Sequence, residues 1–266
     1  MFDAATELGF GTYSLTGDEG REVVAAAIGA GYRHLDTARL YGNETKVGDA
    51  IDAADVPRED LLVATKVAHF EEPEKTQSYV RSAVEESFER LGVDHIDLLY
   101  HHWRRDRAEI ETVLPVLEEF VEDGRVDHLG VSNYTVDDVE FAREIVDVPI
   151  AANEVEMHPL LPQRELREHH ADRDIDVVAY SPLAQGRVFE EDAISAVAEK
   201  HGVHEAVVSL AWLLEKDAVP IPRTSSVDHL ESNLAARDVV LDEEDVARID
   251  GIERTHRCED PSWMRW

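Results

Sequence analysis

The sequence has one cysteine, few lysines and no long hydrophobic run. A single cysteine, Cys258, excludes a framework of intramolecular disulfides in a chain of 266 residues. No apolar run approaches the ~18 residues of a membrane-spanning helix. The first residues also lack the basic and apolar stretches of a secretory signal. We therefore expect a cytoplasmic protein that does not enter a membrane.

Basic residues are scarce. The chain carries 26 Lys and Arg against 58 Asp and Glu, a formal net charge of -32, and only five of the basic residues are lysines. This charge excludes nucleic acid and anionic membranes as partners, because their phosphates would be repelled. Disorder is the alternative interpretation of high charge, but the regular strand and helix patterns argue against it. The composition favours a prokaryotic protein adapted to high salt, where screening suppresses self-repulsion.

Short apolar runs alternate with helical patterns along the whole chain, and no linker interrupts them. Eight strands are predicted, at Glu7–Gly11, Arg33–Asp36, Leu61–Val67, Ile96–Trp103, His128–Ser132, Ile150–Val155, Val177–Pro182 and Val219–Pro222. Helices are predicted between them at 18–31, 43–54, 75–91, 109–123, 137–147, 163–172, 190–215 and 227–236. Continuous apolar strands are typical of a parallel sheet that is buried on both faces.

Eight β/α units predict a (β/α)8 barrel, the TIM-barrel fold, in one α/β domain. A doubly wound open sheet is the alternative. We expect the barrel domain to span residues 1–266, with an extra helix at Asp242–Ile252 and an irregular tail that holds Trp263 and Trp266.

Four polar residues lie at or just after the carboxyl ends of successive predicted strands: Asp36, Tyr41, Lys66 and His102. Parallel α/β barrels keep their chemistry at this end. A tyrosine hydroxyl titrates near pH ~10, too high for efficient proton donation at neutral pH. A nearby ammonium favours the phenolate, and a carboxylate can hold that ammonium in place. An ordinary buried ion pair between Asp36 and Lys66 is the alternative, but the neighbouring Tyr41 and His102 favour a catalytic set.

Six motifs with barrel-compatible spacing accompany these residues. They are Gly31 to Ala38 with Tyr41-Gly42-Asn43-Glu44 and Val47-Gly48; Leu91-Gly92 with Asp94, Asp97 and His102-Trp103; Gly130 to Tyr134; Asn153 to Pro159; Ala179 to Leu183; and Ile221-Pro222-Arg223-Thr224. Together they resemble the aldo-keto reductase family over nearly the whole chain. The resemblance implies that Tyr41 is the general acid, that Lys66 lowers its pKa, and that Asp36 pairs with Lys66. It assigns His102, rather than the competing His101, to the substrate oxygen.

The resemblance also implies a nicotinamide cofactor. Tyr180 would stack on the nicotinamide ring, with Ser181 and Leu183 beside it, and Ser132 and Asn133 would bind the carboxamide. Glu154 stands where glutamine is usual in the family. A carboxylate can accept a hydrogen bond from the carboxamide NH2 but cannot donate one to its C=O.

The phosphate end is expected at the loop after the eighth strand, where barrels often hold phosphates at a helix start. Arg223, Thr224 and Ser225 precede a predicted helix there. Arg223 replaces the lysine usual in the family, His229 replaces an arginine that commonly meets the adenosine 2′-phosphate, and Asn233 matches the residue at the adenine. We expect NADP rather than NAD.

Three aromatic residues are candidates for an apolar substrate pocket: Tyr13, Phe70 and Trp103, with Trp263 or Trp266 as further candidates. We expect a monomeric reductase of small aldehydes or ketones. The alternative is a cofactor-binding barrel that acts as a sensor or regulatory subunit. The sequence has no His-Glu-x-x-His or cysteine cluster, so a metal site is not predicted.

The net charge predicts a strong dependence of stability on salt. The screening length falls from about 30 Å at 0.01 M salt to about 3 Å at 1 M, so repulsion among the carboxylates shrinks to immediate neighbours. The melting temperature should rise steeply between these KCl concentrations. An uncharged osmolyte should give a smaller rise, because it strengthens apolar burial without screening charge. A melting temperature that is flat across this salt range would reject the high-salt interpretation.

Overall fold

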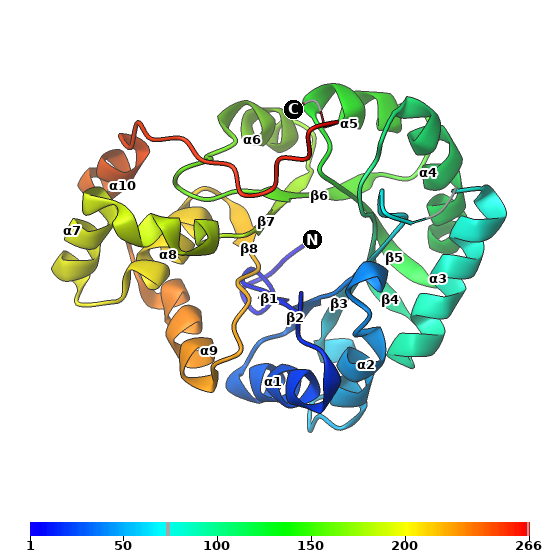
Figure 1. The fold of residues 1–266 in the computed structure, drawn as a ribbon, viewed down its shortest axis with the longest axis horizontal. Helices are drawn as coiled ribbons and strands as arrows, with labels where there is room; N and C mark the ends of the chain where they lie inside the picture. Colours follow the sequence, from blue (N-terminus) through cyan, green and yellow to red (C-terminus); the bar gives the residue numbers. More distant parts are fainter. Residues whose placement is uncertain (73–74, 265) are drawn as a thin grey trace.

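A computed structural model describes residues 1–72, 75–264 and 266. Eight parallel strands pair in chain order: β1 (Phe10–Gly11), β2 (His34–Asp36), β3 (Leu62–Val67), β4 (Ile96–His101), β5 (Val126–Ser132), β6 (Ile150–Glu156), β7 (Asp176–Tyr180) and β8 (Ala218–Pro220). Helices surround this ring of strands (Figure 1). The arrangement confirms the predicted (β/α)8 barrel and excludes the doubly wound open sheet.

Two prolines lie at the closure between the first and last strands. The Gly9 N–H donates to the Pro220 carbonyl at 2.9 Å, and the Gly11 N–H donates to the Pro222 carbonyl at 3.1 Å. Proline has no N–H group to donate, so the first and last strands share fewer backbone hydrogen bonds than a complete parallel pair. The barrel therefore closes through hydrogen bonds in which the carbonyl groups of Pro220 and Pro222 are the acceptors.

The helices of the outer layer are α1 (Gly17–Ala30), α2 (Glu44–Asp52), α3 (Gln77–Leu91), α4 (Arg107–Glu122), α5 (Val136–Arg143), α6 (Arg164–Ala171), α7 (Asp192–His201), α8 (Glu205–Glu215), α9 (Val227–Leu234) and α10 (Glu243–Asp250). The predicted single helix at 190–215 is wrong. Gly202 adopts a left-handed conformation with φ of 66° and ends α7, as glycine does at helix ends. The His204 side chain then caps the start of α8. Among the described residues, none of the helices has the length and apolar character needed to span a bilayer.

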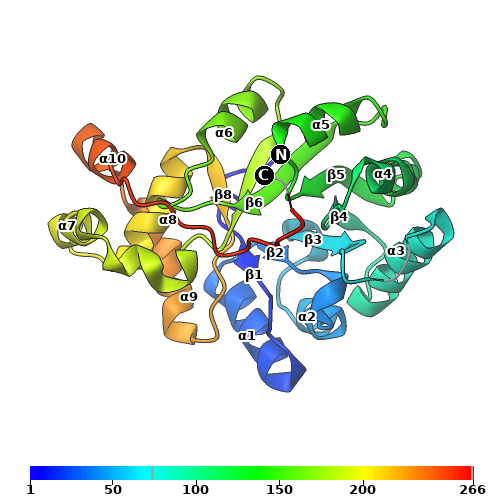
Figure 2. The same cartoon turned by 45° about the horizontal axis from the view of Figure 1, so that its top comes forward.

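Inward and outward side chains alternate along the strands. One apolar cluster lies between strands and helices, and a smaller one inside the barrel includes Ala64, Leu98, Tyr100 and Val178. On β3, Thr65 therefore points outward to Glu44 of α2, whereas Lys66 points into the barrel. After α10, the C-terminal segment crosses the end of the barrel toward α5 (Figures 1 and 2).

Two helical glycines test the packing of the outer layer. A Cβ at Gly48 in α2 would lie 2.3 Å from the Leu91 carbonyl oxygen at the end of α3. Gly48→Ala should therefore lower the free energy of unfolding by roughly 1–3 kcal/mol, as overpacking does. A Cβ at Gly29 in α1 would meet nothing within 4 Å. Gly29→Ala is the control and should be neutral or stabilising by up to about 1 kcal/mol. Urea unfolding in molar KCl measures both, and equal effects would contradict the packing argument.

Candidate active site

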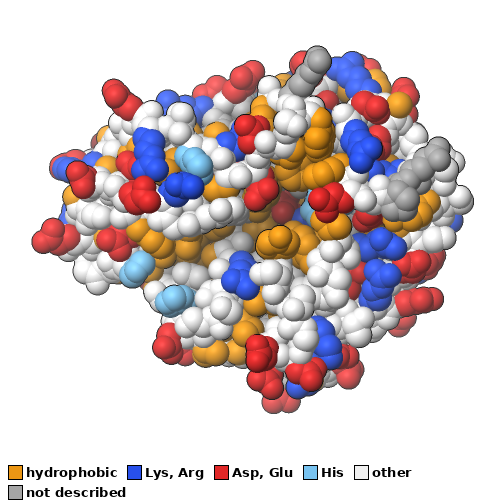
Figure 3. Space-filling model, viewed as in Figure 1, with side chains coloured by type: hydrophobic (Ala, Val, Ile, Leu, Met, Phe, Trp, Pro, Cys, Tyr) orange, Lys and Arg blue, Asp and Glu red, His pale blue; other side chains and the backbone are white. Residues whose placement is uncertain are grey.

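The four predicted catalytic residues come from four neighbouring parts of the barrel. Asp36 is the last residue of β2, Lys66 lies near the end of β3, and His102 directly follows β4. Tyr41 ends a short 3-10 helix, η1 (Arg39–Tyr41), after β2. A cavity of about 690 Å³ opens here, and Asp36, Tyr41 and His102 line it. Figure 3 shows a hollow in the middle of this face, rimmed by hydrophobic side chains.

Lys66 is fully buried and contacts two carboxylates. Its ammonium donates to Asp36 and, at 3.0 Å, to the Thr37 carbonyl. Glu154 Oε2 lies 3.2 Å from the same nitrogen. Burial alone would lower the pKa of Lys66, but Asp36 and Glu154 outweigh it and raise the pKa above its ordinary value. Lys66 therefore carries its charge at every physiological pH.

Tyr41 lies above this ion pair, with the Lys66 nitrogen 5.4 Å from its ring centroid. Burial raises the pKa of Tyr41, and the Lys66 ammonium opposes that shift without cancelling it. Lys66 thus lowers the pKa of Tyr41, which is the direction expected from the sequence. The larger effect of burial leaves the pKa above its ordinary value. Tyr41 is a protonated acid at neutral pH.

His102 faces Tyr41 across the cavity, with ring centroids 5.8 Å apart. Burial, and then the positive charge of Lys66, hold the pKa of His102 well below its ordinary value. A neutral imidazole has one N–H to donate. His101 instead bonds the Tyr134 hydroxyl at 2.7 Å and does not line the cavity.

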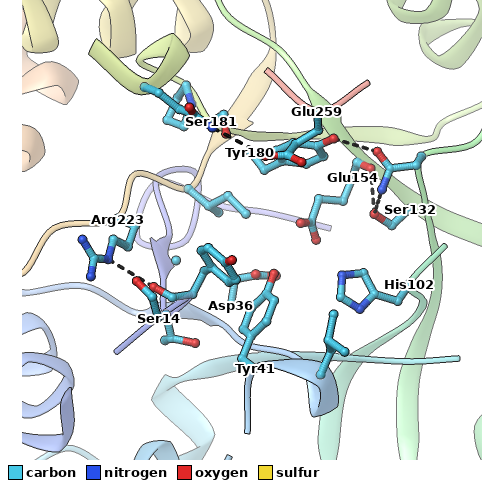
Figure 4. A pocket seen from close by; sticks show the side chains of 18 of the residues that line it. Ser14, Asp36, Tyr41, His102, Ser132, Glu154, Tyr180, Ser181, Arg223 and Glu259 are labelled. Atoms are coloured by element: carbon cyan, nitrogen blue, oxygen red, sulfur yellow. Dashed lines mark hydrogen bonds between the residues drawn. The ribbon is translucent and has the colours of Figure 1, made fainter. Parts of the chain in front are cut away.

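A chain of hydrogen bonds joins β5, β6 and β7 along one wall (Figure 4). The Tyr180 hydroxyl donates to Asn133 Oδ1 at 2.9 Å, Asn133 Nδ2 donates to Ser132 Oγ at 3.1 Å, and Ser132 donates to the Glu154 carbonyl at 3.0 Å. Asn133 and Ser181 have φ of 59° and 47°, a strained conformation of the kind that clusters at functional sites. The predicted residues Ser132, Asn133, Tyr180, Ser181 and Leu183 all line the cavity.

The predicted phosphate-binding residues divide into two groups. Arg223 is exposed, lines the cavity and donates from Nε to the Tyr13 carbonyl at 3.1 Å (Figure 4). Thr224 accepts from the Ser226 N–H at 3.0 Å and lies 3.5 Å from His229 Nδ1. Thr224 and Ser225 precede α9, His229 and Asn233 lie on it, and none of the four lines the cavity.

A family model described as the aldo/keto reductase family matches residues 7–254. The chain belongs to the aldo/keto reductase family.

Its relatives match it over nearly their whole length. An aldo-keto reductase of Mycobacterium sp. (strain JLS) is 35% identical over 254 residues, which cover 94% of this chain and 90% of that protein. A glyoxal reductase of Bacillus subtilis (strain 168) is 34% identical over 250 residues and covers 94% and 89%. The aldo-keto reductase MGS-M4 from a deep-sea metagenome library superimposes with a TM-score of 0.89 at 29% identity, covering 98% and 97%. Aldo/keto reductases are oxidoreductases that act on small carbonyl compounds and generally use nicotinamide cofactors.

Aromatic residues form the other wall of this reductase cavity. Tyr13, Phe70 and Trp103 all line it. Trp263 packs on Phe70 at 4.8 Å and on Trp103 at 6.1 Å between ring centroids, and Trp266 packs on Trp103 at 6.1 Å. Trp263 and Trp266 therefore pack against the residues that line the cavity and do not line it themselves.

Several cavity residues were not predicted from the sequence, among them His69 and Glu259. His69 stacks on His102, with ring centroids 4.6 Å apart. Its place two residues after β3 was the available signal, because strand ends carry the chemistry of barrels. Glu259 belongs to the C-terminal segment, which Glu156 of β6 holds by accepting the N–H groups of Cys258 at 2.6 Å and Glu259 at 2.8 Å. No pattern near Glu259 predicted this contact.

Proposed function

We propose that this chain is an NADP-dependent reductase of small aldehydes and ketones, in which Tyr41 is the general acid. The observation that carries the proposal is a protonated, half-buried Tyr41 beside the Lys66–Asp36 pair, with neutral His102 across the cavity. Such a set can deliver one proton to a carbonyl oxygen at a fixed point.

The cavity residues fit a nicotinamide cofactor. Tyr180 offers a ring whose hydroxyl is held by Asn133. After its bond to Ser132, the Asn133 amide still has a second N–H, and its oxygen has a second lone pair. Arg223 supplies positive charge at another edge of the cavity. When bound, the cofactor supplies the hydride that reduces the carbonyl carbon.

The side chains would divide the remaining work. Tyr41 donates its proton to the carbonyl oxygen as charge develops there. The Lys66 ammonium stabilises the resulting phenolate, and Asp36 holds that ammonium in place. His102 donates its N–H to the same oxygen and so orients the carbonyl group. Because Lys66 is fully buried, water cannot weaken these interactions by screening.

The relatives narrow the substrate class. Glyoxal reductase is the name of one relative at 34% identity, which supports small aldehydes as substrates. The bacterial relatives support a prokaryotic source, and the excess of carboxylates supports adaptation to high salt.

Replacement of the acid tests the chemistry. Tyr41→Phe should lower kcat by about 10² or more, because positioned proton transfer typically contributes 10²–10⁴. Cofactor binding, followed by fluorescence titration, should stay within a few-fold of wild type. Tyr79→Phe is the matched control, because its hydroxyl bonds Glu72 outside the cavity. Near-normal turnover by Tyr41→Phe would reject the assignment, and lack of turnover by the wild type with simple aldehydes would favour a sensor.

Replacement of Arg223 tests the choice of cofactor. Its Nε donates to the Tyr13 carbonyl, which leaves the two terminal nitrogens of the guanidinium to bind a phosphate. Arg223→Ala should weaken NADPH binding by roughly 1.5–3 kcal/mol, the scale of a charged hydrogen bond, and should leave NADH binding nearly unchanged. Arg143→Ala removes the same charge from α5 and controls for the net-charge effect. Equal losses for NADPH and NADH would show that Arg223 contacts a group common to both.

A further inference from the structure

One buried ammonium lies between two buried carboxyl groups in this site. Asp36 reaches Lys66 from β2, and Glu154 reaches it from β6. The three side chains are 0–3% exposed, so water compensates none of the charges. With both carboxyl groups ionised, the cluster would carry a net negative charge inside the barrel. A buried uncompensated charge is costly, so one carboxyl group retains a proton.

Burial raises the pKa of both Asp36 and Glu154, so the two carboxyl groups share this proton, and the geometry favours Glu154 as its main holder. Asp36 accepts a direct hydrogen bond from Lys66. Glu154 Oε2 is within ion-pair distance at 3.2 Å but makes no well-directed hydrogen bond with any described residue. In Figure 4 the Glu154 carboxyl group points into the cavity on the side of Asp36 and Tyr41. Burial, and then the negative charge of Asp36, raise the pKa of Glu154 to about 8.

We propose that Glu154 is a positioning residue. Its protonation state determines how strongly the Lys66 ammonium stabilises the Tyr41 phenolate. This inference rests on the proposed role of Tyr41. When Glu154 is neutral, Asp36 alone balances Lys66, and Tyr41 is at its most acidic. When Glu154 ionises, its negative charge partly neutralises the charge of Lys66 and repels the Tyr41 phenolate. The phenolate is then less stable, so carbonyl reduction slows.

The other groups that face this cluster do not titrate in the same range. Burial raises the pKa of Tyr41, Tyr100 and Tyr180 above the ordinary tyrosine value, and burial lowers the pKa of His102 and His69. Lys66 stays charged. Burial and then the charge of Lys66 also lower the pKa of His34. The Asp36–Glu154 pair, which shares one proton, is therefore the part of the cluster expected to change charge between pH 7 and 9.5. A glutamine at this position could not titrate.

The pH profile of kcat in the reduction direction tests the inference, at saturating substrate and NADPH and at constant molar KCl. Wild-type kcat should fall roughly three- to tenfold from about pH 7 to pH 9.5, on the scale of a one-unit change in the pKa of Tyr41. Glu154→Gln should abolish the fall and hold kcat near its neutral-pH value. Glu154→Asp keeps a titrating carboxyl group and should retain a fall.

Glu44→Gln is the matched control. Glu44 is also buried, and burial raises its pKa, but its carboxylate bonds Thr65 on the outside of the barrel. Its replacement should leave the wild-type fall in place. A fall retained in Glu154→Gln, or absent from the wild type, would overturn the inference. Activity in Tyr41→Phe would instead overturn the proposed function, so the two failures are distinguishable.

Stability gives a second measure that does not depend on turnover. A carboxyl group with a raised pKa in the folded state stabilises the protein fully below its unfolded value of about 4.3, and this contribution is lost as pH rises to the folded value. The melting temperature of Glu154→Gln, relative to wild type, should therefore increase from about pH 5 to pH 8 and level off above that. A difference that is constant with pH would show that Glu154 is ionised throughout and would overturn the inference.

Discussion

The buried ammonium of Lys66 determines how the site is built. A charge placed inside a barrel requires opposite charge close by, and Asp36 at the end of β2 supplies it, with the Glu154 carboxyl group of β6 beside the same ammonium. The Thr37 carbonyl accepts a further hydrogen bond. Lys66 and the two carboxyl groups come from β3, β2 and β6, so the barrel that pairs these strands also sets the distances between the charges.

Successive side chains of a strand point alternately into the barrel and toward the helices, which explains how a polar site can lie within an apolar core. On β3, Ala64 and Lys66 point into the barrel and Thr65 points to the helices. Tyr100 and Val178 fill the interior below the cavity. The polar residues therefore occupy one layer at the carboxyl ends of the strands, and the layers beneath them exclude water.

The fold and the four proposed catalytic residues could be predicted from the sequence because both follow local patterns. Eight apolar runs predicted the barrel, and polar residues at their ends predicted the face with the cavity. The break between α7 and α8 was missed, because apolar periodicity continues across Gly202 and only its backbone conformation ends the first helix. The orientation of Glu154 toward Lys66 was also missed. Its neighbours come from strands far apart in the chain, and no local pattern reports such contacts.

The C-terminal segment is attached to the barrel through its backbone. Glu156 binds the N–H groups of Cys258 and Glu259, and every residue except proline presents such a group. Substitutions in this segment can therefore change the side chains beside the cavity without removing these two bonds. The lining that this segment adds to the cavity can therefore differ while Asp36, Tyr41, Lys66 and His102 stay the same, because these four residues lie on other parts of the chain.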